Sequence, residues 1–141
     1  MTRPARLLVV AGTVSAALAC GPSPERGEMR IPGATRAYRI SVDPSPPHAA
    51  EPARFRVVVQ DRSTGQPIQN GEGRVFATSV DGASTDDGLA KGEEVGTYYA
   101  RLYFVIAGDW AMALQFRADS TERLERVDWM QTVLPEREPG R

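Results

Sequence analysis

Residues 96–116 read GTYYARLYFVIAGDWAMALQF, and the pattern within them predicts the fold. Residues 98–106 are rich in aromatic and branched side chains, which favour a β-strand. A turn is expected at residues 107–109, because Gly108 can adopt a positive φ. Beyond this turn, large apolar side chains recur at every second position, namely Trp110, Met112, Leu114 and Phe116. We therefore expect a hairpin whose second strand is half-buried over a core.

Further stretches predict strands for the same reason. Residues 53–60 (ARFRVVVQ) show the clearest alternation of apolar and polar side chains. The proline-rich residues 43–52 are expected to be a connection, because proline cannot donate to a central ladder. The polar residues 79–88 (SVDGASTDDG) are expected to be a loop. The remaining expected strands cover residues 38–42, 73–80, 89–94 (a short edge strand) and 124–134.

About seven short strands, with no convincing helix after residue 20, predict an all-β fold. The expected architecture is an antiparallel β-sandwich formed by residues 37–135, followed by a disordered tail over residues 136–141. Its core candidates are the large apolar side chains on the inward faces of the expected strands: Phe55, Val57, Val59, Tyr98, Leu102, Phe104, Trp110, Leu114 and Phe116.

The composition bounds the function classes. The 141 residues carry 17 basic and 18 acidic side chains, so we expect no nucleic-acid partner and no polybasic membrane segment. Only Lys91 among the basic residues is lysine; we interpret this arginine usage as the codon bias of a GC-rich genome. A single cysteine, Cys20, excludes an intramolecular disulfide.

The N-terminal residues 1–19 have the pattern of a signal peptide. Arg3 and Arg6 precede an apolar run over residues 7–18, which is shorter than the roughly 20 residues needed to span a bilayer. Ala-Leu-Ala-Cys at residues 17–20 resembles the bacterial lipobox. In that motif the cysteine becomes the acylated N-terminus, carrying long chains such as palmitate.

We therefore predict a lipoprotein anchored through Cys20. Gly21 at the next position resembles the pattern that sorts lipoproteins to the outer membrane, so the domain would face the periplasm. Residues 20–36, rich in proline, glycine and charge, would form a flexible tether. Because Ala-Leu-Ala also fits an ordinary signal-peptidase site, a soluble secreted protein with a free thiol is the alternative.

Three segments carry a family resemblance. They are RFRVVVQDRSTGQPI (54–68), GTYYARLYF (96–104) and AGDWAMALQF (107–116), and their order is similar to the YtkA-like and FixH-like domains of bacterial cell-envelope proteins. This resemblance covers about half of the chain. It implies an immunoglobulin-like sandwich, and it implies possible roles in copper handling or oxidase assembly, with which some relatives are linked.

Candidate metal ligands are few. A copper-handling or oxidase-assembly accessory role would have to use Met29, His48, Met112 or Met130, of which Met29 and His48 are the most exposed in our prediction. The loop over residues 79–88, where metal-binding relatives carry Met and His, contains neither, which disfavours copper. Its aspartates, Asp81, Asp86 and Asp87, do not follow calcium-loop spacing and are interpreted as a solvated turn.

The pattern contains no convincing catalytic group. His48 is the sole histidine, lies among prolines and is expected to be a solvent-exposed loop residue. We therefore predict a non-catalytic binding or assembly module without metal or cofactor, with an envelope protein as a possible partner. Trp129 is the candidate partner contact if its face is exposed, and burial at the end of the sandwich is the alternative.

Overall fold

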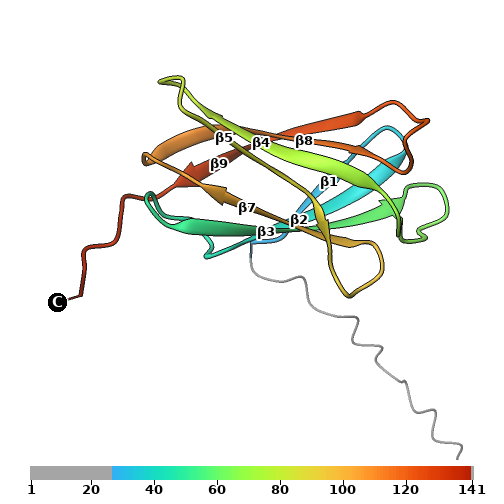
Figure 1. Ribbon diagram of the computed structural model, residues 1–141, viewed down its shortest axis with the longest axis horizontal. Helices are drawn as coiled ribbons and strands as arrows, with labels where there is room; N and C mark the ends of the chain where they lie inside the picture. The colour runs from blue at the N-terminus through green and yellow to red at the C-terminus, as the bar shows by residue number, and fades with distance from the viewer. Residues whose placement is uncertain (1–26, 141) are drawn as a thin grey trace, which may run out of the picture.

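A computed structural model describes residues 27–140, which form two antiparallel sheets packed face to face (Figure 1). The first sheet has the order β1-β2-β3-β7-β6, and the second has the order β5-β4-β8-β9. The predicted all-β, immunoglobulin-like sandwich is confirmed. The strands are β1 (Met29–Pro32), β2 (Arg36–Asp43), β3 (Pro52–Asp61), β4 (Glu72–Ser79), β5 (Ser84–Gly88), β6 (Ala90–Lys91), β7 (Thr97–Tyr103), β8 (Gly108–Arg117) and β9 (Glu125–Val133).

The predicted hairpin over residues 96–116 is wrong. Strand β7 pairs with β3 and β6 in the first sheet, whereas β8 pairs with β4 and β9 in the second. The turn is therefore an arch that crosses the core from one sheet to the other. Gly108 does have a positive φ, of 122°. Both strands carry large apolar side chains on one face, and a hairpin and an arch both let these faces meet the same core. Alternation alone therefore does not distinguish the two connections.

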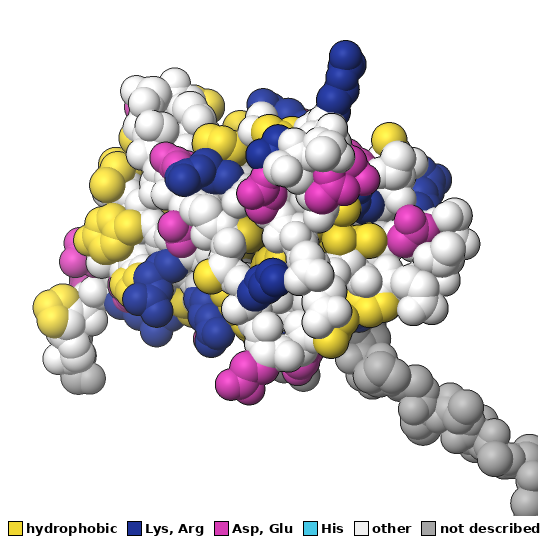
Figure 2. Space-filling view, turned by 45° about the vertical axis from the view of Figure 1, so that its right-hand side comes forward, with side chains coloured by type: hydrophobic (Ala, Val, Ile, Leu, Met, Phe, Trp, Pro, Cys, Tyr) yellow, Lys and Arg dark blue, Asp and Glu magenta, His cyan; other side chains and the backbone are white. Residues whose placement is uncertain are grey.

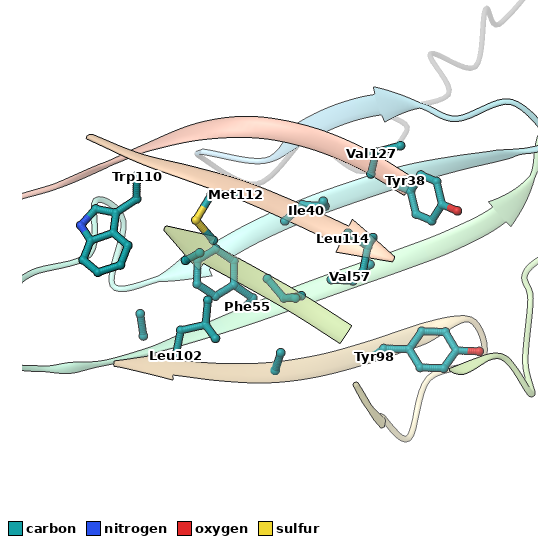
Figure 3. Close-up of a cluster of buried hydrophobic side chains, with 14 of the residues drawn as sticks. Tyr38, Ile40, Phe55, Val57, Tyr98, Leu102, Trp110, Met112, Leu114 and Val127 are labelled. Atoms are coloured by element: carbon teal, nitrogen blue, oxygen red, sulfur yellow. The ribbon is translucent and has the colours of Figure 1, made fainter. Parts of the chain in front are cut away.

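The core prediction is confirmed for all nine candidates, each of which is no more than 1% exposed. Phe104 and Trp110 fill the corner of the arch with their ring centroids 5.1 Å apart, and the Trp110 indole Nε1–H donates to the Ile106 carbonyl at 3.1 Å. Met112 lies in the core as well, between the two sheets (Figure 3). Figure 3 also shows Tyr38 and Tyr98 at the same end of this core.

Two boundaries differ from the prediction. Residues 29–32, expected in the tether, form strand β1 along β2, so the sandwich starts before residue 37. Residues 84–88, expected in a loop, form strand β5 along β4. Both are short edge strands. β5 has no apolar side chain, and the two alternating apolar residues of β1, Met29 and Ile31, are too few to predict a strand without its neighbour. Nine strands result, compared with about seven expected.

A turn follows β3, and Asp61 stabilises it. Asp61 Oδ1 accepts hydrogen bonds from the Ser63 hydroxyl at 2.7 Å and from the backbone N–H groups of Ser63 and Thr64, both at 2.9 Å. These bonds, the Ser63 hydroxyl first, lower the pKa of Asp61 to about 2. The turn closes when the Asp61 N–H donates to the Gln66 carbonyl at 2.8 Å.

The signal peptide, Cys20 and the first part of the tether lie outside the described residues. At the other end, residues 135–140 contain no strand, and Arg137 Nε lies 3.4 Å from a Glu51 carboxylate oxygen. Residues 27–140 contain no helix long and apolar enough to cross a membrane.

Candidate functional site

The predicted copper ligands lie in separate parts of the sandwich. Met112 is buried in the core, and Met130 is 61% exposed on the outer face of the same sheet. Met29 packs against the core from the edge strand β1 of the other sheet. His48 is half-buried rather than exposed, because its Nδ1 bonds the Pro135 carbonyl at 2.9 Å. Residues 27–140 bring no three His, Cys, Asp or Glu residues together as metal ligands.

The aspartates of the 79–88 segment have structural partners. Asp86 forms an ion pair with Arg74 across the β4–β5 hairpin. Asp87 Oδ2 accepts the backbone N–H of Arg101 at 2.8 Å, which links β5 to β7 between the two sheets. Asp81 lies exposed in the turn.

Trp129, the candidate partner contact, is half-buried on the inner side of β9. Its ring lies 6.5 Å from that of Phe55, in a tilted arrangement. The indole Nε1 is buried and has no hydrogen-bond partner within residues 27–140. Most of this ring therefore contributes to packing between the sheets.

The most distinctive surface is the outer side of the first sheet. Because side chains alternate between faces, the apolar residues of β2, β3 and β7 point inward and their neighbours point outward. The outward set is rich in arginine and tyrosine. We call this surface the arginine face; it consists of Arg30, Arg39, Arg54, Arg56, Tyr99, Arg101 and Tyr103.

The strand register brings like charges together on the arginine face. Arg30 lies directly opposite Arg39, and Arg54 lies directly opposite Arg101. Like charges at directly opposed positions destabilise a sheet. Arg54 also stacks on Tyr99, with its guanidinium carbon 4.0 Å from the ring centroid. The Tyr99 ring therefore holds one of the two central arginines in place.

Carboxylates balance only part of this charge. Glu28 lies 3.8 Å from both Arg30 and Arg39, and Glu94 pairs with Arg56 at 2.9 Å. Asp43 lies opposite Arg54 in the register, but no ion pair forms. Within residues 27–140, the guanidinium groups of Arg54 and Arg101 form no ion pair, although the backbone N–H of Arg101 donates to Asp87. The five arginines and three carboxylates give the face a net charge of +2.

The outer face of the second sheet differs in charge. Its three arginines each form an ion pair with a carboxylate on the same face, and Asp109 adds a further negative charge. The net charge of that face is −1. The pairs are Arg74–Asp86, Arg117–Glu72 and Arg126–Asp128. On the side of the first sheet, by contrast, Figure 2 shows several Lys and Arg side chains close together in the lower part of the view, beside exposed hydrophobic side chains.

An open depression of about 510 Å³ lies on the part of the arginine face that is next to the edge strand β6. Three cationic side chains line it, those of Arg54, Lys91 and Arg101, together with the Tyr99 ring and one carboxylate, Asp87. The Lys91 ammonium donates to the Asn70 side-chain oxygen at 2.6 Å, which holds it at the rim. Chemically, this arrangement suits a phosphate or carboxylate group, for which arginine supplies paired donors.

A second depression, of about 480 Å³, lies at the end of the sandwich where β2 and β9 begin. Arg36, only 8% exposed, forms ion pairs there with Glu122 and, at 3.3 Å, with Glu125. Burial lowers the pKa of Arg36, but the hydrogen bond and charge of Glu122 outweigh this and raise it. The buried charge is thus neutralised internally, and we interpret this cluster as structural.

Sequence reasoning found only part of the arginine face. The alternation over residues 53–60 places Arg54 and Arg56 outward, as expected. It could not place Arg30, Arg39 and Arg101 beside them, because that depends on the register of four strands. Arginine at alternate positions within strands is the local signal that points to such a face.

No family model matches the chain, and no curated protein matches it in sequence. Among solved structures, the chain is similar to the crystal structure of a DUF4426 family protein from Pseudomonas aeruginosa PAO1, with a TM-score of 0.62. The similarity covers 80% of this chain and 99% of that chain, at 12% sequence identity. A likeness at this identity shows the fold alone. The resemblance to YtkA-like and FixH-like domains stays a prediction.

Proposed function

We propose that this protein is a non-catalytic binding module of the bacterial cell envelope, held at a membrane by lipid on Cys20. We further propose that it binds an anionic ligand through the arginine face. The observation that supports this proposal is the pair Arg54 and Arg101, two opposed cations without an ion-pair partner among residues 27–140.

A bound anion would change the energetics of this pair. Without a ligand, the two guanidinium groups repel each other across the strands. A phosphate or carboxylate between them would accept charge-assisted hydrogen bonds from both, which are stronger than neutral ones. The sheet supplies a rigid backbone for these arginines, so little ordering is needed on binding. The face offers cations and aromatic rings rather than an acid–base pair, which suits binding rather than catalysis.

The tether can be tested by intact mass measurement of the mature protein purified from its host's membrane fraction. A mass equal to residues 20–141 plus glyceride and acyl chains supports the lipid on Cys20. A mass without lipid refutes the anchor and leaves a free N-terminal thiol.

Anion binding can be tested by elution of the same protein from immobilised heparin in a salt gradient. The double variant Arg54→Gln/Arg101→Gln should elute at clearly lower salt than the natural protein, because two phosphate-type contacts are lost. The matched control is Arg74→Gln/Arg117→Gln, which removes the same charge from the outer face of the second sheet. Equal shifts in both variants would show that overall charge, rather than the arginine face, governs retention.

A further inference from the structure

We infer that the arginine face lies against the surface of the membrane that holds the lipid, and that its anionic ligand is the phosphate layer of acidic phospholipids. This inference rests on the proposed function, of which it specifies the ligand. It commits the arginine face to a lipid surface rather than to an acidic protein.

The first argument is the length of chain between the predicted anchor and the sandwich. Six residues separate Cys20 from Gly27, the first described residue. Fully extended, this stretch reaches at most about 25 Å. The ten-residue strand β3 alone is about 33 Å long, so the tether is shorter than the domain it holds. A sandwich held this closely must present one of its surfaces to the headgroups.

The second argument is where the tether joins the sandwich. The described chain begins at Gly27 and continues into β1, which is an edge strand of the first sheet (Figure 1). Gly27 packs beside the loop after β2, since a Cβ atom at Gly27 would lie 2.6 Å from the Ser45 hydroxyl. The short tether therefore starts from the first sheet, the sheet that carries the arginine face.

The third argument is chemical complementarity. Arginine and tyrosine together suit the boundary of a bilayer, where phosphates are the acceptors and amphipathic rings lie at the headgroup level. Tyr103 is 49% exposed on this face, and Val105, just beyond the end of β7, is 56% exposed. The second sheet, by contrast, has its arginines paired and a net negative outer face. An anionic surface therefore attracts the first sheet and repels the second.

Because of the tether, a low intrinsic affinity of the arginine face for the membrane is sufficient. A short linker gives an effective concentration in the millimolar range, so weak contacts become populated once the lipid is inserted. Each arginine near an anionic surface strengthens association by about fivefold. The unpaired Arg54 and Arg101 are therefore enough to fix the orientation of a tethered domain.

Arginine footprinting of the mature protein tests this inference without any mutation. The protein from its host is combined with vesicles of phosphatidylcholine alone, or of equal parts phosphatidylcholine and phosphatidylglycerol. It is then treated with phenylglyoxal, and modified arginines are quantified by peptide mass spectrometry. We expect Arg54 and Arg101 to react about fivefold more slowly on the anionic vesicles, and Arg74 and Arg117 to react equally on both.

A variant pair shows whether the face docks as one surface. In Arg54→Gln/Arg101→Gln, the remaining arginines of the face should lose their protection on anionic vesicles. The matched Arg74→Gln/Arg117→Gln protein should retain it. High salt should abolish protection in the natural protein, because surface electrostatic attraction is screened.

The outcomes separate this inference from the proposed function. A lipidated protein without protection of the arginine face overturns the inference and leaves the anchor intact. Heparin retention that depends on Arg54 and Arg101, with no protection on anionic vesicles, identifies a soluble or protein-borne anion and also overturns it. The same phenylglyoxal treatment is also applied to the intact native envelope. Protection there, without protection on protein-free vesicles, assigns the face to an acidic protein and is a third contrary result. Protection on anionic vesicles by a protein without lipid supports membrane contact and refutes the anchor alone.

Discussion

The hydroxyl groups of Tyr38 and Tyr98 offer a matched test of how buried polar groups stabilise this sandwich. Both side chains are 1% exposed, and both rings pack edge-on against Phe116, with centroid distances of 6.1 and 5.4 Å. The Tyr98 hydroxyl donates to the Ile68 carbonyl at 2.6 Å and accepts the Gly71 N–H at 2.9 Å. Removing this hydroxyl therefore breaks two hydrogen bonds.

The Tyr38 hydroxyl differs in having no hydrogen-bond partner within residues 27–140. Burial raises the pKa of Tyr38, and the charge of Glu125 raises it further, while Arg36 opposes the shift. Arg36 is thus close to the hydroxyl, but the geometry between them does not form a hydrogen bond. Burial also raises the pKa of Tyr98, so both phenols are protonated at neutral pH.

The magnitudes follow from these contacts. A buried hydrogen bond contributes about 0.5–1.5 kcal/mol net, so Tyr98→Phe should lower the free energy of unfolding by about 1–3 kcal/mol. Tyr38→Phe loses no hydrogen bond and removes a buried polar group without a partner, so it should leave the free energy of unfolding unchanged or raise it. For a domain of this size, 1 kcal/mol corresponds to a shift in Tm of roughly 4 °C.

Urea unfolding of the two variants and the natural chain, followed by tryptophan fluorescence, measures the difference. Trp110 is fully buried and reports loss of the core. The reasoning fails if Tyr38→Phe costs as much as Tyr98→Phe. That result would mean that an ordered water or Arg36 satisfies the Tyr38 hydroxyl in solution. An unchanged Tyr98→Phe protein would equally contradict it.

Three further perturbations test other parts of the fold. Gly73→Ala would place a Cβ atom 2.3 Å from the Gln115 carbonyl and should destabilise the chain by about 1–3 kcal/mol, whereas Gly88→Ala meets nothing closer than 3.7 Å and should be tolerated in the same urea assay. Trp110→Ala should cost about 3–5 kcal/mol, or prevent folding, because it empties the corner of the arch; a cost below 1 kcal/mol would contradict that placement. The lowered pKa of Asp61 contributes stability that is complete above its unfolded pKa of about 4 and is lost as the pH falls toward 2. Asp61→Asn should therefore flatten the fall in unfolding free energy measured between pH 5 and pH 2, and an unchanged slope would exclude this contribution.

The sequence by itself determined the main core residues and seven of the nine strand segments. Alternation over two residues is a local property, so Phe55 in β3 and Trp110 in β8 could be assigned to the core without knowing their neighbours. Turn chemistry is equally local: Asp61 bonds to residues two and three positions further along the chain, and Gly108 has the positive φ that glycine permits. The N-terminal pattern that points to Cys20 is also read directly from consecutive residues.

Only the tertiary structure decided which strands are partners. Strands β7 and β8 have the composition of a hairpin, but β7 pairs with β3 and β6 while β8 pairs with β4 and β9, which places them in opposite sheets. Pairing also created the edge strands β1 and β5, whose own residues carry little strand signal. The arginine face depends most strongly on the strand pairing, since a slip of one residue in any strand would turn the arginines of that strand to the other face of the sheet. The charge pattern that supports the proposed function is therefore a property of register, which arises from contacts between residues far apart in the chain.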